Sequence, residues 1–266
     1  MMNRYIIPTV AALCAMLCSC SVKEDRSGCP TWLQLTINDC RQYSKDLSIL
    51  LFENNDNCVF EESVAVDDYP DYYEREIPKG YYKLVSYTGI RRCRVEGDMM
   101  LIPHGEDADS LYAYNNNLIC QDEFTRDSVM LQKRYATVFL KVNMLGEEVC
   151  PYDYAVYSSV NGTYLSTFAP VHGSFYKALV LDEFYQANFT LPRQDDNRPE
   201  DLYILATDRD SKLTHVIPLG SSIDETGYSW NSRDLEDIYL TIDYVECTFE
   251  IKVADWEAGN EFDMMF

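Results

Sequence analysis

The stretch IYLTIDYVECTFEIKV, residues 238–253, decides the fold class, because apolar and polar side chains alternate along both of its halves. The apolar residues are even-numbered in the first half and odd-numbered in the second: Ile238, Leu240, Ile242 and Tyr244, then Cys247, Phe249, Ile251 and Val253. A period of two is typical of a strand with one buried face. Since a slip of one residue turns the buried face over, the change of phase predicts a bulge or a tight turn near residues 244–246.

Strand-like patterns recur along most of the chain. TWLQLTI at 31–37 and YATVFLKV at 135–142 both alternate, and the apolar run LSILLFE at 47–53 ends in a polar turn. The pair Asn161–Gly162 lies between two strand-like runs and predicts a hairpin. No segment shows a helical stripe longer than ~12 residues. Many short strands with turn signals indicate β-sandwiches, so we expect an all-β protein with two sandwiches that divide near residues 128–135.

The chain begins with a segment typical of a lipoprotein signal peptide. Arg4 precedes an apolar run from Ile6 to Leu17, which is too short to span a bilayer because a spanning helix needs ~20 apolar residues. The four residues 17–20, LCSC, then match a lipobox, with an aliphatic residue three places before the last cysteine and a small residue directly before it. We expect cleavage after residue 19 and lipidation of Cys20, since the bulky leucine disfavours the other cysteine.

The charge of the chain limits its partners. It contains 44 acidic and 22 basic residues among 266, a formal net charge of −22. Nucleic acid is not expected as a partner, because phosphate binding requires lysine and arginine. Anionic lipid headgroups are disfavoured for the same reason, so the lipid on Cys20 is the expected contact with the membrane.

The sequence predicts no enzyme activity, no cofactor and no metal site. The three histidines lie in unrelated contexts: His104, His172 and His215. A phosphate-binding glycine loop, a nucleophile elbow and a CxxC motif are all missing from the sequence. The acidic run VDDYPDYYERE, residues 66–76, could bind calcium or form a tyrosine platform for glycans, but a solvated loop leading into a half-buried strand is favoured.

Seven cysteines follow Cys20, so at least one of them has no intramolecular partner. Cys29 and Cys40 are the first pair to test for a disulfide. Several of the others lie in strand-like runs, where a cysteine behaves as a small buried apolar residue.

The order of these segments resembles the FimB/Mfa2 family of fimbrial anchor lipoproteins of Bacteroidetes. The likeness begins at the lipidated cysteine and runs to the last strands, through EDRSGCPTWLQL (24–35), LSILLFENND (47–56), IPKGYYKLVSYTG (77–89), VMLQKRYATVFLKV (129–142), SIDETGYSWNSRDLEDIYLTIDYV (222–245) and IKVADW (251–256). The resemblance implies two transthyretin-like, Greek-key β-sandwich domains. It also implies a non-enzymatic protein that anchors the base of a type V pilus to the outer membrane and joins pilin subunits by strand exchange.

The domain boundaries follow from this resemblance together with the strand pattern. We expect a signal peptide at 1–19, a lipidated tether at 20–30, an N-terminal domain at 31–130 and a C-terminal domain at 131–266. The family's shaft subunits are cut by an arginine-specific protease. We do not expect such a cut in the RRCR segment, residues 91–94, because it would separate the body of the protein from its lipid.

Three charged residues of the tether, Lys23, Glu24 and Asp25, resemble the signal that exports such lipoproteins to the outer face of the cell. The protein is therefore expected in the outer membrane, held by its lipid and facing the exterior.

The end of the chain is a candidate donor strand. Phe262, Met264 and Phe266 occupy every second position, as a strand that enters the groove of another subunit would require. The alternative is that this tail is an edge strand of its own domain. A surface glycan-binding lipoprotein and a fimbrial tip adhesin remain the alternative functions.

Overall fold

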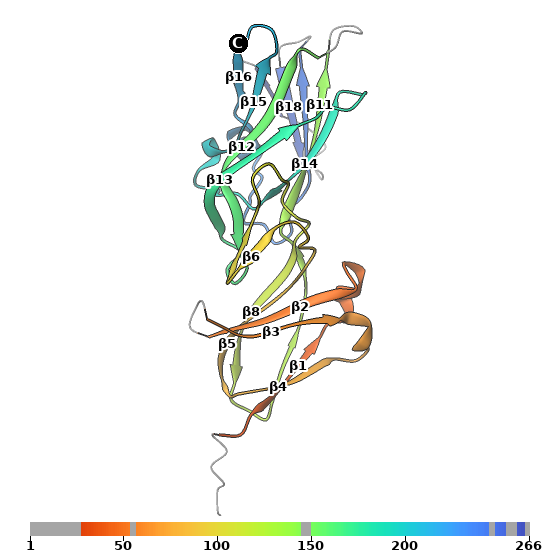
Figure 1. Cartoon of the computed structure of the whole chain (residues 1–266), viewed down its shortest axis with the longest axis vertical. Coiled ribbons are helices and arrows are strands. Elements are labelled where there is room, and N and C mark those ends of the chain that lie inside the picture. The colour runs from red at the N-terminus through yellow and green to blue at the C-terminus, as the bar shows by residue number, and fades with distance from the viewer. Residues whose placement is uncertain (1–27, 54–56, 145–149, 245–247, 254–259, 264–266) are drawn as a thin grey trace, which may run out of the picture.

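The computed structural model describes residues 28–53, 57–144, 150–244, 248–253 and 260–263. The molecule is elongated and built almost entirely of strands (Figure 1), which confirms the predicted all-β class. In the described residues the strands form four sheets.

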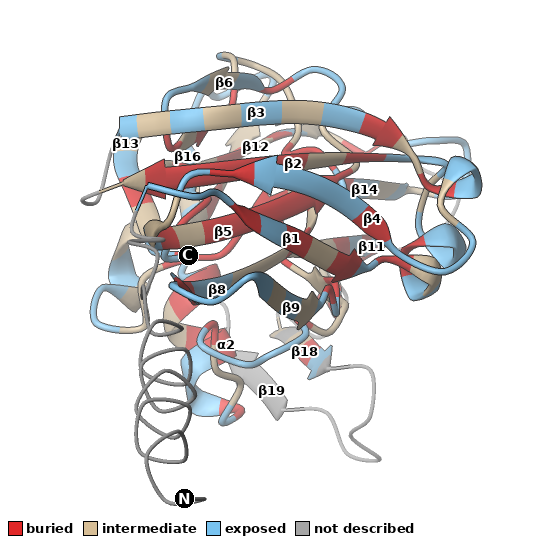
Figure 2. Cartoon of the chain, turned by 90° about the horizontal axis from the view of Figure 1, so that it is seen from below, coloured by how far each residue is buried: buried red, intermediate tan, exposed pale blue. Residues whose placement is uncertain are grey.

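Two sheets come from the first half of the chain. The smaller has the order β4-β1-β9 and the larger the order β10-β8-β5-β2-β3. Their strands are β1 (Thr31–Thr36), β4 (Tyr73–Ile77) and β9 (Phe124–Ser128), then β2 (Asp46–Glu53), β3 (Asn57–Ala65), β5 (Gly80–Thr88), β8 (Tyr112–Cys120) and β10 (Gln132–Lys133). Figure 2 shows β3 at the border of its sheet, largely exposed or half-buried, whereas β5 is mostly buried.

The other two sheets come mainly from the second half. One has the order β14-β11-β17-β18-β19 and the other the order β16-β15-β12-β7-β6, with β13 paired to β12. Their strands are β11 (Tyr135–Asn143), β14 (Gln186–Pro192), β17 (Ile238–Asp243), β18 (Thr248–Val253) and β19 (Asn260–Asp263), then β6 (Arg94–Glu96), β7 (Met99–Leu101), β12 (Tyr152–Tyr164), β13 (Pro170–Leu179), β15 (Tyr203–Asp208) and β16 (Thr214–Ile217).

The described helices are short. They are the α-helix α2 (Leu219–Glu225) and the 3-10 helices η1 (Asn38–Gln42), η2 (Val66–Asp68) and η3 (Pro199–Asp201). Within the described ranges, no helix has the length and apolar character needed to cross a bilayer.

Each pair of sheets encloses a buried apolar cluster. Leu33 of β1 and Leu84 of β5 belong to the first cluster, and Leu140 of β11 and Ile204 of β15 to the second. The two clusters lie on opposite faces of β2. Ile49 and Leu51 belong to the first cluster, and Leu50 and Phe52 belong to the second. A strand that is buried on both faces reads as a continuous apolar run rather than an alternating one.

The change of phase at residues 238–253 marks a hairpin. β17 and β18 pair antiparallel, with Ile238 opposite Val253 and Leu240 opposite Ile251. Residues directly opposite each other share a face of the sheet. In this register each even-numbered residue of β17 is opposite an odd-numbered residue of β18, so the apolar residues of both strands lie on one face. This pairing confirms the predicted reversal, although residues 245–247 of the turn lie outside the described ranges.

The predicted hairpin at Asn161–Gly162 is wrong. β12 runs through both residues, with register shifts against β13, and the chain turns at residues 165–169 instead. Glycine is required there because β7 approaches closely: a Cβ at Gly162 would lie 2.1 Å from the carbonyl oxygen of Met100. In this protein the Asn-Gly pair therefore marks a crowded strand crossing.

The hairpin β6–β7 crosses the predicted domain boundary. It lies inside 31–130, yet β7 pairs with β12 at Gly162, Thr163 and Tyr164. We propose to keep the division at 130/131, with this hairpin as an arm that extends from the first domain into a sheet of the second.

Candidate functional site

Most residues of the predicted lipid site and donor strand lie outside the described part of the chain. These are Cys20, Lys23, Glu24 and Asp25 near the start, and Met264 and Phe266 at the end. Phe262 is described and belongs to β19, so the structure bears directly on the position of the tail.

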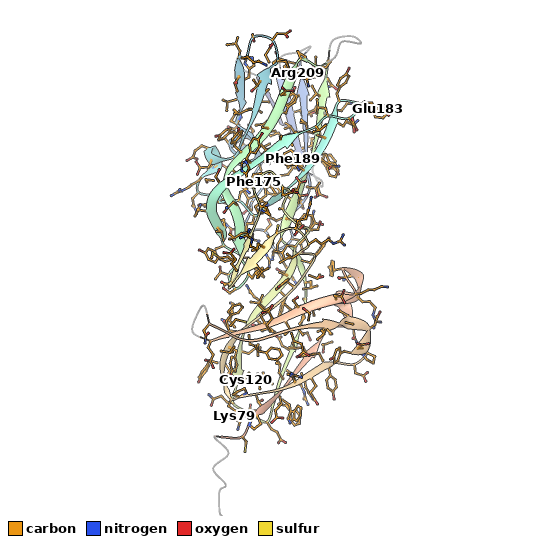
Figure 3. The ribbon with its side chains drawn as sticks, viewed as in Figure 1. Lys79, Cys120, Phe175, Glu183, Phe189 and Arg209 are labelled. Atoms are coloured by element: carbon orange, nitrogen blue, oxygen red, sulfur yellow. The ribbon has the colours of Figure 1, made fainter. Side chains whose placement is uncertain are left out.

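The first described residues and the last strands lie at opposite ends of the molecule. β1 and β4 are at one end of the long axis, while β11, β15, β16 and β18 reach the other (Figure 1). Lys79 lies near the first end and Arg209 near the second (Figure 3). Gly28, Cys29 and Pro30 line a shallow hollow together with residues 76–79, so the chain enters β1 at the first end.

The structure counts against a disulfide between Cys29 and Cys40. Both are free thiols, one exposed just before β1 and the other buried just after it. A strand of six residues spans about 20 Å, whereas a disulfide needs Cα atoms within about 7 Å. The Cys40 thiol packs in the first apolar cluster, where burial raises its pKa to about 12, so it is a poor nucleophile.

The tail residues 260–263 form the border strand of a sheet. β19 pairs antiparallel with β18, from Thr248 opposite Asp263 to Ile251 opposite Asn260. For these four residues the structure shows the alternative to a donor strand, which is an edge strand packed at home. An edge strand presents unpaired N–H and C=O groups on its open side, and another chain can pair with them.

The opposite border of the same sheet, β14, makes contacts near both of its ends. β14 follows Asp182, whose carboxylate accepts the N–H groups of Phe184 (2.8 Å) and Gln186 (2.9 Å). Near the other end of β14, the backbone N–H of Ala108 donates to the carbonyl oxygen of Thr190 at 3.1 Å. Because these contacts occupy the border of β14, the β19 border is the better candidate for pairing with a partner strand.

An aromatic pair lies on the outer face of this sheet. Phe139 of β11 and Tyr239 of β17 are opposite each other and stack with ring centroids 5.1 Å apart. Both side chains are exposed. Lys252 of β18 is opposite Tyr239 and bridges Glu250 at 3.0 Å. Sequence reasoning missed this pair, because only the parallel register of β11 and β17 brings the two rings together.

A second feature is a hollow on the first domain. It has a volume of about 650 Å³ and is lined by Gln34, Thr36, Tyr72, Tyr114, Arg126, Asp127, Ser128 and Met130. The Nε of Arg126 donates to the side-chain oxygen of Gln34 at 2.8 Å, and the exposed pair Trp32 and Phe124 adjoins it across β1 and β9.

The tyrosines of VDDYPDYYERE do not form one platform. Tyr73 is buried in the first apolar cluster and donates to Glu62 at 2.7 Å, and burial together with this bond raises its pKa. Tyr72 is exposed and lines the hollow described above.

The RRCR segment leads into β6 and is held by one buried carboxylate. Asp109 accepts the backbone N–H groups of Arg91, Arg92 and Cys93, each at 2.7 Å. Burial alone would raise the pKa of Asp109, but these three bonds stabilise the carboxylate and the net pKa is lowered. The side chains of Arg92 and Arg94 are exposed.

The histidines of the described ranges make separate contacts. His104 stacks on Tyr176 at 5.1 Å, and His172 lies 3.7 Å from Asp195. Throughout the described ranges, no group of three or more histidine, cysteine, aspartate or glutamate residues is placed to hold a metal ion.

Comparison with solved structures identifies the fold. A candidate polysaccharide-binding protein from Bacteroides thetaiotaomicron matches with a TM-score of 0.62 at 12% identity, covering 88% of this chain and 98% of its own. The fimbrial anchor protein Mfa2 from Porphyromonas gingivalis matches with a TM-score of 0.61 at 14% identity, covering 89% and 100%. A candidate adhesin from Bacteroides ovatus matches with a TM-score of 0.60 at 13% identity, covering 92% and 99%.

No family model matches this sequence, and no curated protein sequence is significantly similar to it. The identities to the solved structures are low, so the likeness is one of fold. Each match extends along most of both chains, which includes all four sheets rather than one sandwich. The chain thus has the all-β fold of Mfa2-like fimbrial proteins of Bacteroidetes.

Proposed function

We propose that this protein is a non-enzymatic lipoprotein that anchors the base of a fimbria to the outer membrane and binds pilin subunits through strand pairing. The lipid on Cys20 is the membrane contact, and Lys23, Glu24 and Asp25 direct the protein to the outer face of the cell. The observation that carries this proposal is that the described chain enters β1 at one end of the long axis, while β18, the strand that pairs with β19, reaches the other end (Figure 1). An anchor needs this polarity, because one end faces the membrane and the other faces the shaft.

The likeness to Mfa2 supports a role in a fimbria, since that protein is itself a fimbrial anchor. Strand pairing at the β19 border can occur in two ways. Residues 260–266 can leave β18 and enter a pilin groove, or they can stay on β18 and accept a pilin strand alongside. In both cases backbone hydrogen bonds supply the affinity and alternate side chains supply the specificity.

A reversible crosslink distinguishes the two directions. Glu250 and Glu261 are opposite each other in β18 and β19, so the double variant Glu250→Cys, Glu261→Cys can be joined by a disulfide under oxidising conditions. If the tail is donated, the oxidised variant should lose pilin capture and regain it on reduction. If the border accepts a strand, capture should continue in both states. The single variant Glu250→Cys is the matched control.

Deletion of residues 259–266 tests the border itself. The truncated protein should remain folded and lipidated but fail to retain pilin subunits at the cell surface. Normal retention by this variant would refute the assignment of the β19 border. The variant Cys20→Ser is the complementary control: it should keep pilin binding in solution and lose membrane attachment.

Glycan binding is a second candidate function, favoured by the hollow beside β1 and β9. Exposed aromatic faces, a guanidinium and amide groups are the side chains that sugars require. Tyr72 and Arg126 line this hollow, and one structural match is a candidate polysaccharide-binding protein. Glycan-array binding that disappears in Arg126→Ala but persists after deletion of 259–266 would assign the function to the hollow.

A further inference from the structure

Two buried arginines lie next to each other where the two sandwiches join. Arg134 is the single residue between β10, which pairs with β8, and β11, which pairs with β14. Arg193 directly follows β14, and the last pair of that ladder is Tyr135 with Pro192. The two arginines are therefore cross-strand neighbours, and they are only 6% and 8% exposed.

Neither guanidinium is neutralised by an ion pair in the described structure. Arg134 donates from Nη2 to the side-chain oxygen of Gln132, and its guanidinium lies 3.8 Å from the centroid of the Phe168 ring. Arg193 donates from Nη2 to the carbonyl oxygen of Ser232 at 2.7 Å. The Nε atoms of both arginines are buried and lack a hydrogen-bond partner.

The nearby carboxylates are already engaged. Asp196 accepts hydrogen bonds from Trp230 N (2.8 Å), Ser229 Oγ (3.0 Å) and Asn231 Nδ2 (2.6 Å). Asp234 accepts the backbone N–H of Lys133 at 2.8 Å. Burial lowers the pKa of Arg134 to about 10, and the neighbouring Arg193 contributes to the lowering, but the side chain stays charged at neutral pH.

An unpaired buried charge is costly, and two like charges side by side are more so. Asp234 and Asp196 act on Arg134 and Arg193 only through space, and the described structure shows no direct salt bridge to either arginine. The pair can therefore take up a further counter-ion, although the chain has twice as many acidic as basic residues. The Nε and Nη groups of a guanidinium form a planar fork that matches two oxygens of one anion. The loop that supplies Phe168 also holds this residue at φ 59°, a conformation that is rare for a bulky side chain.

We propose that Arg134 and Arg193 together bind one small oxyanion, of the phosphate, sulfate or carboxylate type, at the joint between the sandwiches. The bound anion accepts hydrogen bonds from the two free Nε–H groups and neutralises the pair. Because Arg134 is the connection between β10 and β11, occupancy stiffens the joint.

Thermal unfolding of the full-length lipoprotein in detergent tests this site. Inorganic phosphate, sulfate and acetate are titrated separately from zero to about 20 mM at constant ionic strength. At a concentration about ten times its dissociation constant, an anion should raise the Tm by about 3 to 5 °C, with a saturable dose dependence. Which of the three acts at the lowest concentration identifies the type of oxyanion.

The variant Arg193→Gln should abolish the saturable shift. Arg209→Gln is the matched control, because Arg209 is an exposed arginine paired with Asp153 near the far end of the molecule, and it should keep the shift. If Arg193→Gln does not fold, line broadening of the phosphate signal in 31P NMR with the unmodified protein, competed by sulfate, provides the readout. No saturable effect of any of the three anions, or equal effects in wild type and Arg193→Gln, would overturn the proposal.

Discussion

Replacing Gly162 by alanine should separate the β6–β7 arm from the second domain. A Cβ at this position would lie 2.1 Å from the carbonyl oxygen of Met100, whereas real Cβ atoms essentially never approach closer than 3.0 Å. The obstacle is backbone on a paired strand, because Gly162 is opposite Leu101 of β7 and Val171 of β13. No side-chain rotation relieves such a contact, so β7 must move by about 1 Å or leave β12.

The energetic cost follows from what β7 loses. The register joins three residue pairs between β7 and β12, and the N–H of Ile102 donates to the carbonyl of Asn161 at 2.8 Å. Losing two or three backbone hydrogen bonds costs about 0.5–1.5 kcal/mol each. Partial exposure of Met100, which is 1% exposed, adds about 1–2 kcal/mol. We expect the free energy of unfolding to fall by about 3–5 kcal/mol.

Gly173→Ala is the matched control. Gly173 lies on β13, beside β12, and the three atoms nearest to a Cβ there all belong to the side chain of Asn161. A flexible side chain can rotate away, so this variant should lose less than about 1 kcal/mol. Urea unfolding gives the free energies, and hydrogen exchange at residues 94–101 reports whether the arm has separated. If Gly162→Ala matches the control in both measurements, the assignment of a steric crossing at this glycine is refuted.

Three further changes test the buried polar contacts. Asp109→Asn should flatten the acid side of the curve of stability against pH. The pKa of Asp109 is lowered in the folded protein, so this carboxylate contributes stability above its ordinary pKa of 3.8, and the contribution is lost as the pH falls through the folded-state pKa. An unchanged pH profile in the variant would contradict this. Tyr154→Phe removes the buried hydroxyl that donates to Tyr244 at 2.9 Å and should cost about 1 kcal/mol in urea unfolding. Asp98→Ala removes the acceptor for the N–H of Ser166 at 2.7 Å and for its hydroxyl, which should cost about 2–4 kcal/mol and increase hydrogen exchange in residues 165–169.

The fold class was predictable because burial on one face imposes a period of two. Val138, Leu140 and Val142 alternate with exposed or half-buried neighbours along β11, as the sequence pattern predicted. The change of phase between β17 and β18 predicted a bulge or a tight turn, and the antiparallel pairing of the two strands agrees with the turn. Local pattern fails where the decisive contact is distant. The pair Asn161–Gly162 has the sequence of a turn, but the backbone that crowds Gly162 belongs to Met100, 62 positions earlier in the chain.

The candidate sites also differ in whether local or distant residues form them. The lipidated tether and the donor role of the tail rest on local signals, a lipobox and an alternating strand, and they stay predictions because most of their residues lie outside the described ranges. The hollow on the first domain could not be predicted, since the parallel pairing of β1 with β9 joins residues about 90 positions apart, such as Gln34 and Arg126. The buried arginines were equally hidden: arginine is normally exposed, and only the β11–β14 register brings Arg134 and Arg193 together.

The placement of β1 has a mechanical consequence for an anchor. The tether continues directly into β1, which is the central strand of its sheet, with β4 antiparallel on one side and β9 parallel on the other. In the proposed anchor, a pull from the membrane would act along β1, so it would load the hydrogen bonds to β4 and to β9 together instead of opening them one at a time. The second domain then receives the load through the β10–β11 connection at Arg134, the β6–β7 arm and the shared apolar cluster. Among the described strands, β19 pairs with β18 alone, so a pull on it loads hydrogen bonds on one side. In the proposed anchor, the end that faces the membrane is therefore held by the central strand of a sheet, whereas β19, a border strand, belongs to the sheet proposed to face the shaft.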